Sequence, residues 1–287
     1  MSPKGSKSTK SGPVVKAVQL VLVGLTLFFV IIAISSRNLS SDSQSVSPYL
    51  RNGFRKYVMS SPAPLFAALP KVNTFGIRTA PIPSFLYGTA WKKGRTEELV
   101  DLAVRNGFRG IDTACQPKHY FESGVGDALE KLFTEGFITR SDIFIQTKYT
   151  PYDGQDPNNV PYDENANYTA QVMQSYRQSL ANLKTTYLDS LVLHSPMSTL
   201  EDTMEVWRAF ESIHADGGVI YLGISNCYDL DVLEGLYTKA KVKPSFLQNR
   251  FYSESGYDRT IRTFCSKNNI KYQSFWSLTA NPKALER

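Results

Sequence analysis

The chain has 287 residues, 42% of them hydrophobic, so it is long enough to bury one large core or two ordinary ones. Its three cysteines are too few for a disulfide framework, and none has the neighbours that a zinc site requires. Four units of the net charge of +6 come from the lysines among residues 1–16. The rest of the chain is nearly neutral, which argues against a nucleic-acid partner.

The first predicted element is an uncharged apolar stretch at residues 17–34. As a helix, this stretch spans about 27 Å, enough for a thin bilayer core. We therefore predict a basic tail over 1–16 and a single transmembrane anchor over 17–36. A cleaved signal peptide and a buried core helix are the alternatives, although a signal core is usually only about 7–15 residues long. The lysines before the anchor place the N-terminus in the cytosol and the rest of the chain in an endomembrane lumen.

Residues 37–81 are rich in Ser, Pro and Arg and are predicted to form a linker. From residue 82 onward, short apolar runs alternate with amphipathic ones. The apolar runs predict seven strands, at 84–88, 109–114, 142–149, 188–195, 219–226, 245–250 and 270–277. The amphipathic runs predict six helices, at 96–107, 124–136, 166–184, 199–218, 229–241 and 258–269. This alternation predicts a parallel sheet joined by right-handed crossovers.

Two α/β architectures fit this pattern, an open doubly wound sheet and a TIM-type (β/α)8 barrel. No G-x-G-x-x-G motif follows the first strand, so a dinucleotide-binding start of the doubly wound kind is unsupported. Polar residues stand at the C-terminal ends of five different strands, and a barrel gathers such ends around one axis. They are Asp112, Lys148, His194, Ser225 with Asn226, and Gln248. We therefore predict a barrel over residues 82–287.

The predicted barrel is incomplete. Because one strand–helix unit takes about 30 residues, an eighth strand would begin beyond Arg287, where the sequence ends. About seven strands are therefore expected, and the sequence is expected to lack the C-terminal part of the barrel.

Six fragments in a fixed order carry a family resemblance. They are GFRGIDTA, a Tyr followed by E-x-x-V-G, a Lys at the end of the third strand, LVLHSP, GISN and KPSFLQNR. Together they resemble the aldo-keto reductases, from about residue 82 to the C-terminus. The resemblance implies a (β/α)8-barrel oxidoreductase that uses NADPH to reduce aldehydes and ketones to alcohols.

The resemblance also implies four catalytic residues. Carbonyl reduction needs a proton for the oxygen, and a Tyr hydroxyl can supply it if a Lys ammonium lowers its ordinary pKa of about 10. By resemblance, Tyr120 is the general acid, Lys148 lowers its pKa, Asp112 holds Lys148, and His194 orients the carbonyl. The gap of eight residues between Asp112 and Tyr120 is longer than the family's usual one. His119 therefore remains the alternative at the acid position.

For the cofactor, the resemblance implies that Ser225, Asn226 and Gln248 bind the nicotinamide amide. It also implies that Phe275 stacks on the nicotinamide ring and that the backbone of Thr89 contacts the cofactor. In this family the groups that hold the NADP phosphates follow the eighth strand. We therefore expect the chain as written to bind NADPH weakly or not at all.

The leading hypothesis is a membrane-anchored carbonyl reductase with a small-molecule substrate, no metal and no nucleic-acid partner. The alternatives are a catalytically silent NADP barrel, acting as a redox-sensing or interaction module, and a non-functional truncation. A silent module need not keep all four candidate catalytic residues, which favours the enzyme.

Overall fold

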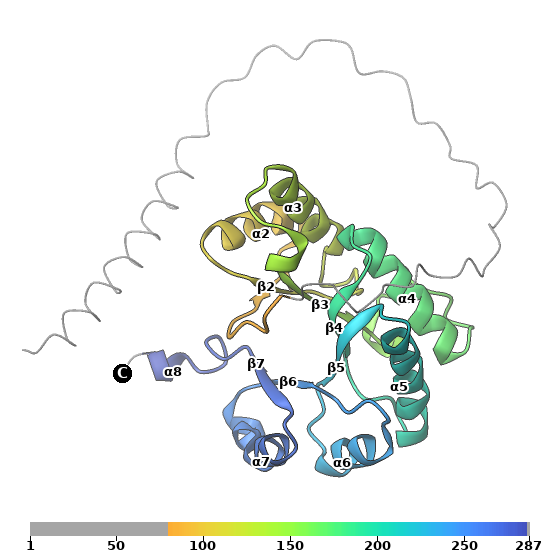
Figure 1. The fold of residues 1–287 in the computed structure, drawn as a ribbon. Helices are drawn as coiled ribbons and strands as arrows, with labels where there is room; N and C mark the ends of the chain where they lie inside the picture. The colour runs from red at the N-terminus through yellow and green to blue at the C-terminus, as the bar shows by residue number, and fades with distance from the viewer. Residues whose placement is uncertain (1–79, 286–287) are drawn as a thin grey trace, which may run out of the picture. The chain divides into compact units, whose positions relative to one another are not determined.

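The structure is a computed structural model, and it describes residues 80–285. These residues form one parallel sheet in which the order of the strands follows the chain (Figure 1). The strands are β1 (Tyr87–Gly88), β2 (Gly110–Asp112), β3 (Phe144–Tyr149), β4 (Leu188–Leu193), β5 (Val219–Ser225), β6 (Phe246–Arg250) and β7 (Lys271–Phe275). All seven fall within the strands that the sequence predicts, so the predicted parallel α/β fold is confirmed.

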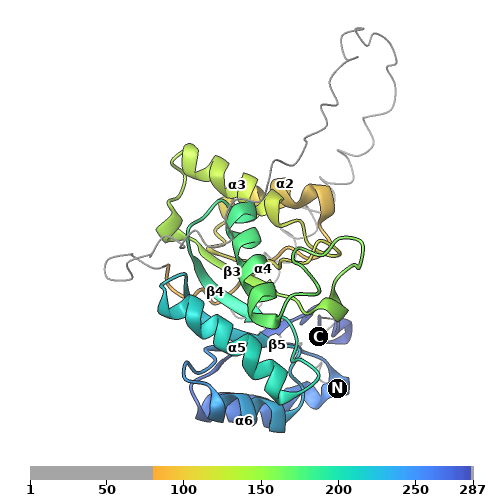
Figure 2. The ribbon, with the colours of Figure 1, turned by 90° about the vertical axis from the view of Figure 1, so that its right-hand side faces the viewer.

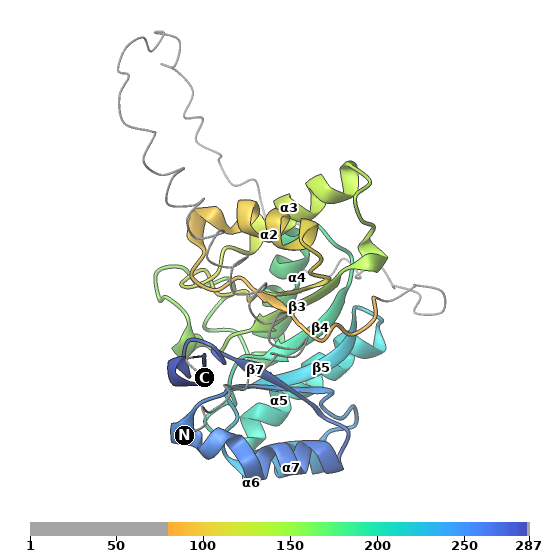
Figure 3. The ribbon, with the colours of Figure 1, turned by 90° about the vertical axis from the view of Figure 1, so that its left-hand side faces the viewer.

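The helices lie outside the sheet. They are α2 (Thr96–Arg105), α3 (Glu122–Thr134), α4 (Tyr168–Leu183), α5 (Leu200–Ala215), α6 (Leu230–Lys239), α7 (Arg259–Lys267) and the short α8 (Pro282–Leu285). Figure 2 shows α4 and α5 side by side over β3, β4 and β5. Figure 3 shows the opposite side, where α7 packs against β7. Four short 3-10 turns, η1 (Lys93–Arg95), η2 (Arg140–Asp142), η3 (Tyr152–Gly154) and η4 (Ser253–Asp258), lie in the connections.

The sheet is curled rather than flat. Gln146 on β3 donates a hydrogen bond of 2.8 Å to Gln273 on β7, although three strands separate β3 from β7 in the sheet. Such a contact requires the sheet to bend toward a barrel. Within residues 80–285, β1 and β7 are the two edges of the sheet and do not pair with each other. The fold is thus a seven-stranded open barrel, consistent with the predicted incomplete (β/α)8 barrel.

A small apolar cluster fills the end of the sheet where the strands begin. Phe144 opens β3 and Phe246 opens β6, and their rings pack edge to face with centroids 6.0 Å apart. Leu86 packs against this cluster and approaches Gly110, where an added Cβ would lie 2.4 Å from its Cδ2 atom. Residues 84–86, which the sequence places in the first strand, are not paired: Leu86 fills this end of the barrel, whereas Ser84 and Phe85 are exposed.

The larger core lies between the sheet and the helices. Its members include Trp207 of α5, which is fully buried and donates through Nε1 to the carbonyl of Val242. Gly126 lets α3 approach α4 closely, because a Cβ there would lie 2.0 Å from the carbonyl oxygen of Asn182. This packing holds the helices against the strands, so the polar strand ends are carried on a rigid scaffold.

No helix within residues 80–285 is long and apolar enough to cross a membrane. The predicted tail over 1–16 and the predicted anchor over 17–36 lie outside the described residues, as does nearly all of the linker over 37–81. These three assignments stay predictions.

Candidate active site

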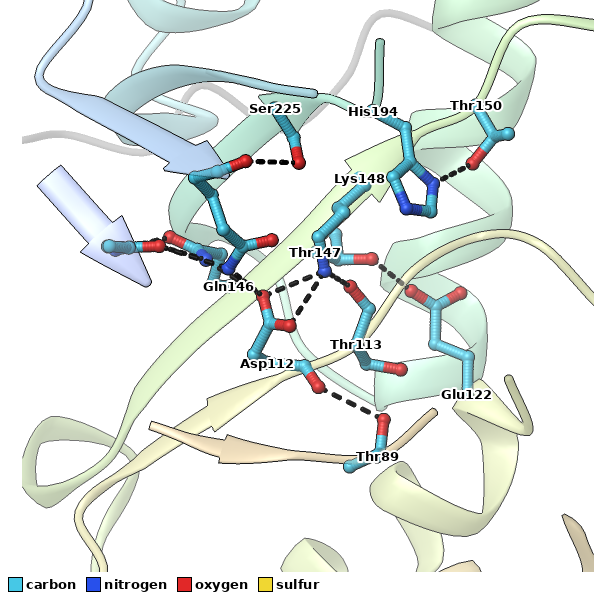
Figure 4. Close-up of polar contacts among 12 residues, drawn as sticks. Thr89, Asp112, Thr113, Glu122, Gln146, Thr147, Lys148, Thr150, His194 and Ser225 are labelled. Atoms are coloured by element: carbon cyan, nitrogen blue, oxygen red, sulfur yellow. Dashed lines mark hydrogen bonds and ion pairs between the residues drawn. The ribbon is translucent and has the colours of Figure 1, made fainter. Parts of the chain in front are cut away.

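Lys148 and Asp112 form a buried ion pair at the C-terminal ends of neighbouring strands (Figure 4). Nζ of Lys148 donates to both carboxylate oxygens of Asp112 and to the carbonyl of Thr113, each at 2.8 Å. An ammonium group has three N–H donors, so all of them have acceptors here. The Lys148 side chain is 1% exposed. A buried ammonium persists only with such partners, so Asp112 and Thr113 are what keep Lys148 in place.

Two glutamine amides also hold the Asp112 carboxylate. Nε2 of Gln146 lies 2.8 Å from Oδ1 of Asp112, and Nε2 of Gln248 lies 3.1 Å from the same oxygen. Gln146 precedes Lys148 by two positions on β3, so the two side chains point to the same face of the strand. Donors from β3 and β6 thus converge on a carboxylate from β2, which fixes its orientation toward Lys148.

Tyr120, and not His119, is the residue beside this pair. The Lys148 ammonium lies 5.2 Å from the centroid of the Tyr120 ring. The ring of His194 meets the Tyr120 ring edge-on, with centroids 5.9 Å apart. His119 instead packs against Trp91, at a ring distance of 3.9 Å. The structure thus brings together the four residues Asp112, Tyr120, Lys148 and His194 and leaves His119 outside them.

Burial sets the charge states of this group. It raises the pKa of the Tyr120 hydroxyl above its ordinary 10.0, and the positive charge of Lys148 offsets this only in part. Lys148 thus acts on the pKa of Tyr120 in the direction that the resemblance implies, but burial outweighs it. Burial by itself lowers the pKa of Lys148. The negative charge of Asp112, together with weaker effects of Tyr120 and Glu122, outweighs burial, so the pKa lies above its ordinary 10.5. Tyr120 is thus a protonated hydroxyl beside a charged Lys148.

His194 is held as a neutral imidazole. Burial, followed by the charge of Lys148, lowers its pKa well below the ordinary 6.5. Its Nδ1 atom is 2.6 Å from the hydroxyl of Thr150. The carbonyl of Thr150 accepts hydrogen bonds from Gln155 and Tyr162, which fixes Thr150 in turn. The Nε2 atom of His194 is therefore the ring nitrogen left to meet a ligand.

Three of the five predicted cofactor-binding residues surround the same group. Ser225 donates to the carbonyl of Gln248 at 2.7 Å, and Asn226 donates to the carbonyl of His194 at 2.8 Å. Asn226 has a left-handed backbone, with φ of 51°. Because these donors are already used, the acceptors on Asn226 and Gln248, Oδ1 and Oε1, are the atoms these two side chains can offer to a ligand amide.

The other two predicted residues have different surroundings. The amide and hydroxyl of Thr89 both donate to the carbonyl of Asp112, at 3.0 and 3.1 Å, so Thr89 braces the end of β2. Phe275 is half-buried at the end of β7. It follows Gln273 by two positions and so shares the inner face of that strand. Phe275 thus lies one layer nearer the mouth than the glutamines.

Sequence reasoning missed three of these polar residues. Each lies two positions from a residue that the sequence singled out. Because residues two apart in a strand point to the same face, strand periodicity could have identified them. They are Gln146 and Thr150, on either side of Lys148, and Gln273, which precedes Phe275.

Comparison with known proteins places this arrangement in a family. The family model described as the aldo/keto reductase family matches residues 85–285. The chain belongs to the aldo/keto reductase family, a family of oxidoreductases, and the resemblance inferred from the sequence is thereby confirmed.

Individual relatives agree with this assignment. Over 178 residues, the chain is 30% identical to the "Uncharacterized oxidoreductase YtbE" of Bacillus subtilis, covering 62% of this chain and 56% of the relative. It is 28% identical over 191 residues to the "NAD(P)H-dependent D-xylose reductase" of Pachysolen tannophilus, covering 58% of this chain and 55% of the relative. An aldo-keto reductase structure from a deep-sea metagenome library superposes with a TM-score of 0.57 at 25% identity, covering 70% of this chain and 66% of the other. The chain thus spans little more than half the length of these two curated relatives.

Proposed function

We propose that the protein reduces aldehydes or ketones to alcohols, with NADPH as the hydride donor and Tyr120 as the general acid. The observation that carries this proposal is the position of Tyr120, whose ring lies 5.2 Å from an ammonium group that Asp112 holds in the protein interior. Family membership and the similarity to an NAD(P)H-dependent D-xylose reductase support the reaction and the cofactor.

The chain's own residues account for the proton half of the reaction. Tyr120 keeps its proton at neutral pH because burial raises its pKa, so it is in the form that an acid needs. Negative charge that develops on the carbonyl oxygen is stabilised by the fixed charge of Lys148 nearby. Neutral His194 donates a hydrogen bond from Nε2 to the same oxygen, provided that Nδ1 accepts from Thr150. Proton delivery leaves a tyrosinate, which the Lys148 ammonium also stabilises.

Asn226 and Gln248 fit the carboxamide of a nicotinamide. Its NH2 group finds acceptors in Oδ1 of Asn226 and Oε1 of Gln248. Ser225 precedes Asn226 in the chain and pairs with Gln248 in the sheet. Bound there, the reduced nicotinamide supplies the hydride. Ser225 and Asn226 keep their positions without it, because their hydrogen bonds go to the protein.

The test compares two variants of the loop after β2. With the purified chain at high NADPH concentration, we expect Tyr120→Phe to lower the turnover of a small aldehyde by about 10²–10⁴-fold. His119→Phe is expected to lower it by much less, because its ring lies on Trp91. Tyr237→Phe is the matched control, since its ring lies on α6 against Phe264 and away from the site.

Two outcomes would count against the proposal. Full activity of Tyr120→Phe would remove Tyr120 from the acid role, whatever the reaction. Absence of carbonyl reduction in the wild-type chain, with folding shown by cooperative unfolding, would favour the silent-barrel alternative instead.

We also propose that residues 17–36 anchor the protein in an endomembrane with the barrel in the lumen. The support is the uncharged apolar stretch at 17–34 behind a lysine-rich tail. Protease treatment of intact microsomes tests this orientation. Digestion of the barrel before the membrane is permeabilised would show that the barrel faces the cytosol.

A further inference from the structure

A cavity of about 300 Å³ opens beside Tyr120, between the loops that follow β1 and β2. The loop after β1 forms one wall, and the loop between β2 and α3 forms the other. The lining residues are Trp91, Lys93 and Gly94 from the first loop and residues 117–121 from the second. Tyr120 belongs to both the cavity and the candidate catalytic group, so the cavity adjoins the proposed acid.

Aromatic rings form the apolar part of the cavity. The rings of Trp91 and His119 are 3.9 Å apart and inclined by 38°. The backbone amide of Trp91 donates to the carbonyl of His119 at 2.7 Å, which joins the two loops. Trp91 and Phe121 are 57% and 44% exposed. Large aromatic side chains left this open beside a cavity offer a surface for a flat apolar group.

The backbone of the first loop is strained at the cavity. Trp91 and Lys93 have φ values of 64° and 50°, a left-handed conformation that is costly for residues other than glycine. Strain of this kind collects at ligand-binding sites, where the surrounding contacts enforce it. Here the hydrogen bond and the ring contact with His119 enforce it.

The charge around the cavity is positive. Lys93 and Lys118 line it and are exposed, and no carboxylate is among its lining residues. Within residues 80–285, neither lysine takes part in an ion pair. Burial, and then the charge of Lys118, lowers the pKa of His119, so its imidazole adds no charge at neutral pH. The lining of the cavity therefore carries two lysines that have no ion-pair partner among the described residues.

We propose that this cavity binds the part of the substrate remote from the reacting carbonyl, and that this part carries a carboxylate or phosphate. The preferred substrates are then small, flat carbonyl compounds with a negative charge. The carbonyl lies at Tyr120, the flat body lies against Trp91 and Phe121, and the anionic group lies between Lys93 and Lys118. This inference rests on the proposed function, because it assigns the substrate class of the same site.

The experiment uses two aldehydes of nearly equal shape, 4-carboxybenzaldehyde and its neutral analogue 4-formylbenzamide. The quantity measured is the ratio of their kcat/KM values with the wild-type chain and NADPH. We expect the ratio to favour the carboxylate and to fall about two- to fivefold in Lys93→Gln or Lys118→Gln, the usual scale for an exposed charge pair. It is expected to fall about tenfold in the double variant, and to shrink in wild type at about 1 M salt because the charges are then screened.

Lys271→Gln is the matched control, because Lys271 is an exposed lysine at the opposite end of the sheet. It is expected to leave both kcat/KM values unchanged. A ratio that is near one in wild type, or that falls equally in Lys271→Gln, would overturn the assignment of an anionic substrate while leaving carbonyl reduction intact.

A binding measurement separates this inference from the proposed function. Benzoate and benzamide are titrated against tryptophan fluorescence in the absence of NADPH. We expect benzoate to quench the emission of Trp91 at lower concentration than benzamide, and the difference to disappear in the Lys93→Gln, Lys118→Gln double variant. If neither aldehyde is reduced yet benzoate binds in this way, the proposed function fails while the anion site remains. Equal binding of the two ligands would overturn the site.

Discussion

Nε2 of Gln248 lies 3.1 Å from Oδ1 of Asp112, although the two residues belong to β6 and β2 and are 136 positions apart. The contact exists because the curled sheet turns both side chains to its interior. Gln248 also donates to Gln273, which exchanges hydrogen bonds with Gln146. Three glutamines thus form a buried polar layer beneath the Lys148–Asp112 pair. Such a layer is stabilising only while every member keeps its partners.

Replacement of Gln146 by Leu tests this layer. Gln146 is fully buried, and its loss removes a donor to Asp112 and the acceptor of the Gln273 amide. An unsatisfied buried polar group costs about 1–3 kcal/mol, so we expect the free energy of unfolding to fall by that amount in urea titrations. Gln178→Leu on the exposed face of α4 is the control and is expected to stay within about 0.5 kcal/mol of wild type. Equal effects of the two substitutions would show that the layer contributes nothing specific.

Asp112→Asn tests the ion pair itself. The substitution leaves the buried Lys148 ammonium without its counter-charge, and breaking a buried pair in this way costs about 3–5 kcal/mol. Without Asp112, burial also lowers the pKa of Lys148, so the loss of stability is smaller at alkaline pH, where Lys148 can become neutral.

The double variant Asp112→Asn, Lys148→Met separates a charge effect from a packing effect. It removes both charges, and we expect it to be more stable than Asp112→Asn alone in the same urea titrations. A double variant less stable than either single one would mean that the two side chains matter for their shape and not for their charges.

The sequence predicted the strands well because their apolar runs are short, bounded and regularly spaced. The polar strand ends also indicated where the site lies, since the C-terminal ends of parallel strands meet at one end of a barrel. Residues 84–86 were misplaced because Phe85 and Leu86 form an apolar run that resembles a strand, although Leu86 fills the end of the barrel and Phe85 is exposed. No local signal in the sequence distinguishes such an unpaired run from a paired strand.

Charge states and side-chain partners were less accessible from the sequence. Tyr120 and His119 are adjacent, and only the three-dimensional path of the loop places one at Lys148 and the other at Trp91. The pKa of Tyr120 depends on how far burial outweighs the charge of Lys148, and that balance is a property of the folded interior. Spacing alone could not give its sign.

Glu122 predicts a specific dependence of stability on pH. Its carboxyl group is buried at the start of α3 and accepts hydrogen bonds from Thr147, Ser179 and Asn182. Burial raises its pKa above the ordinary 4.5. The folded protein therefore holds this proton more tightly than the unfolded chain does. The resulting stabilisation of the folded state is complete below pH 4.5 and is lost as the pH rises through the folded-state pKa of Glu122.

Glu122→Gln removes this titration. We expect the free energy of unfolding of the variant, relative to wild type, to rise with pH above 4.5. The slope is at most about 1.4 kcal/mol per pH unit, the value for one proton. Urea titrations from about pH 4.5 to 7.5 measure it. Gln178→Leu, on the exposed face of α4, is the control and should show no slope relative to wild type, because it removes no titratable group. A flat difference for Glu122→Gln as well would mean that its proton is bound equally in both states.

Thr150 is predicted to position His194 by fixing which nitrogen carries the proton. Its hydroxyl lies 2.6 Å from Nδ1, and Nε2 must be the protonated nitrogen if His194 is to donate to a substrate oxygen. We expect Thr150→Val, which keeps the shape and removes the hydroxyl, to lower kcat about tenfold, the lower range for a lost hydrogen bond to a catalytic group. Thr150→Ser restores the hydroxyl and should restore kcat.

A nuclear magnetic resonance titration of the three histidines provides the readout that a merely structural role would not change. In wild type, the Nε2-protonated signal of His194 should persist to lower pH than in an ordinary histidine, because burial and the charge of Lys148 lower its pKa well below 6.5. In Thr150→Val, the signal should shift toward the Nδ1-protonated form, since Nδ1 has lost its only hydrogen-bond partner among the described residues. An unchanged signal together with a reduced kcat would show that Thr150 acts on the site by some route other than the state of His194.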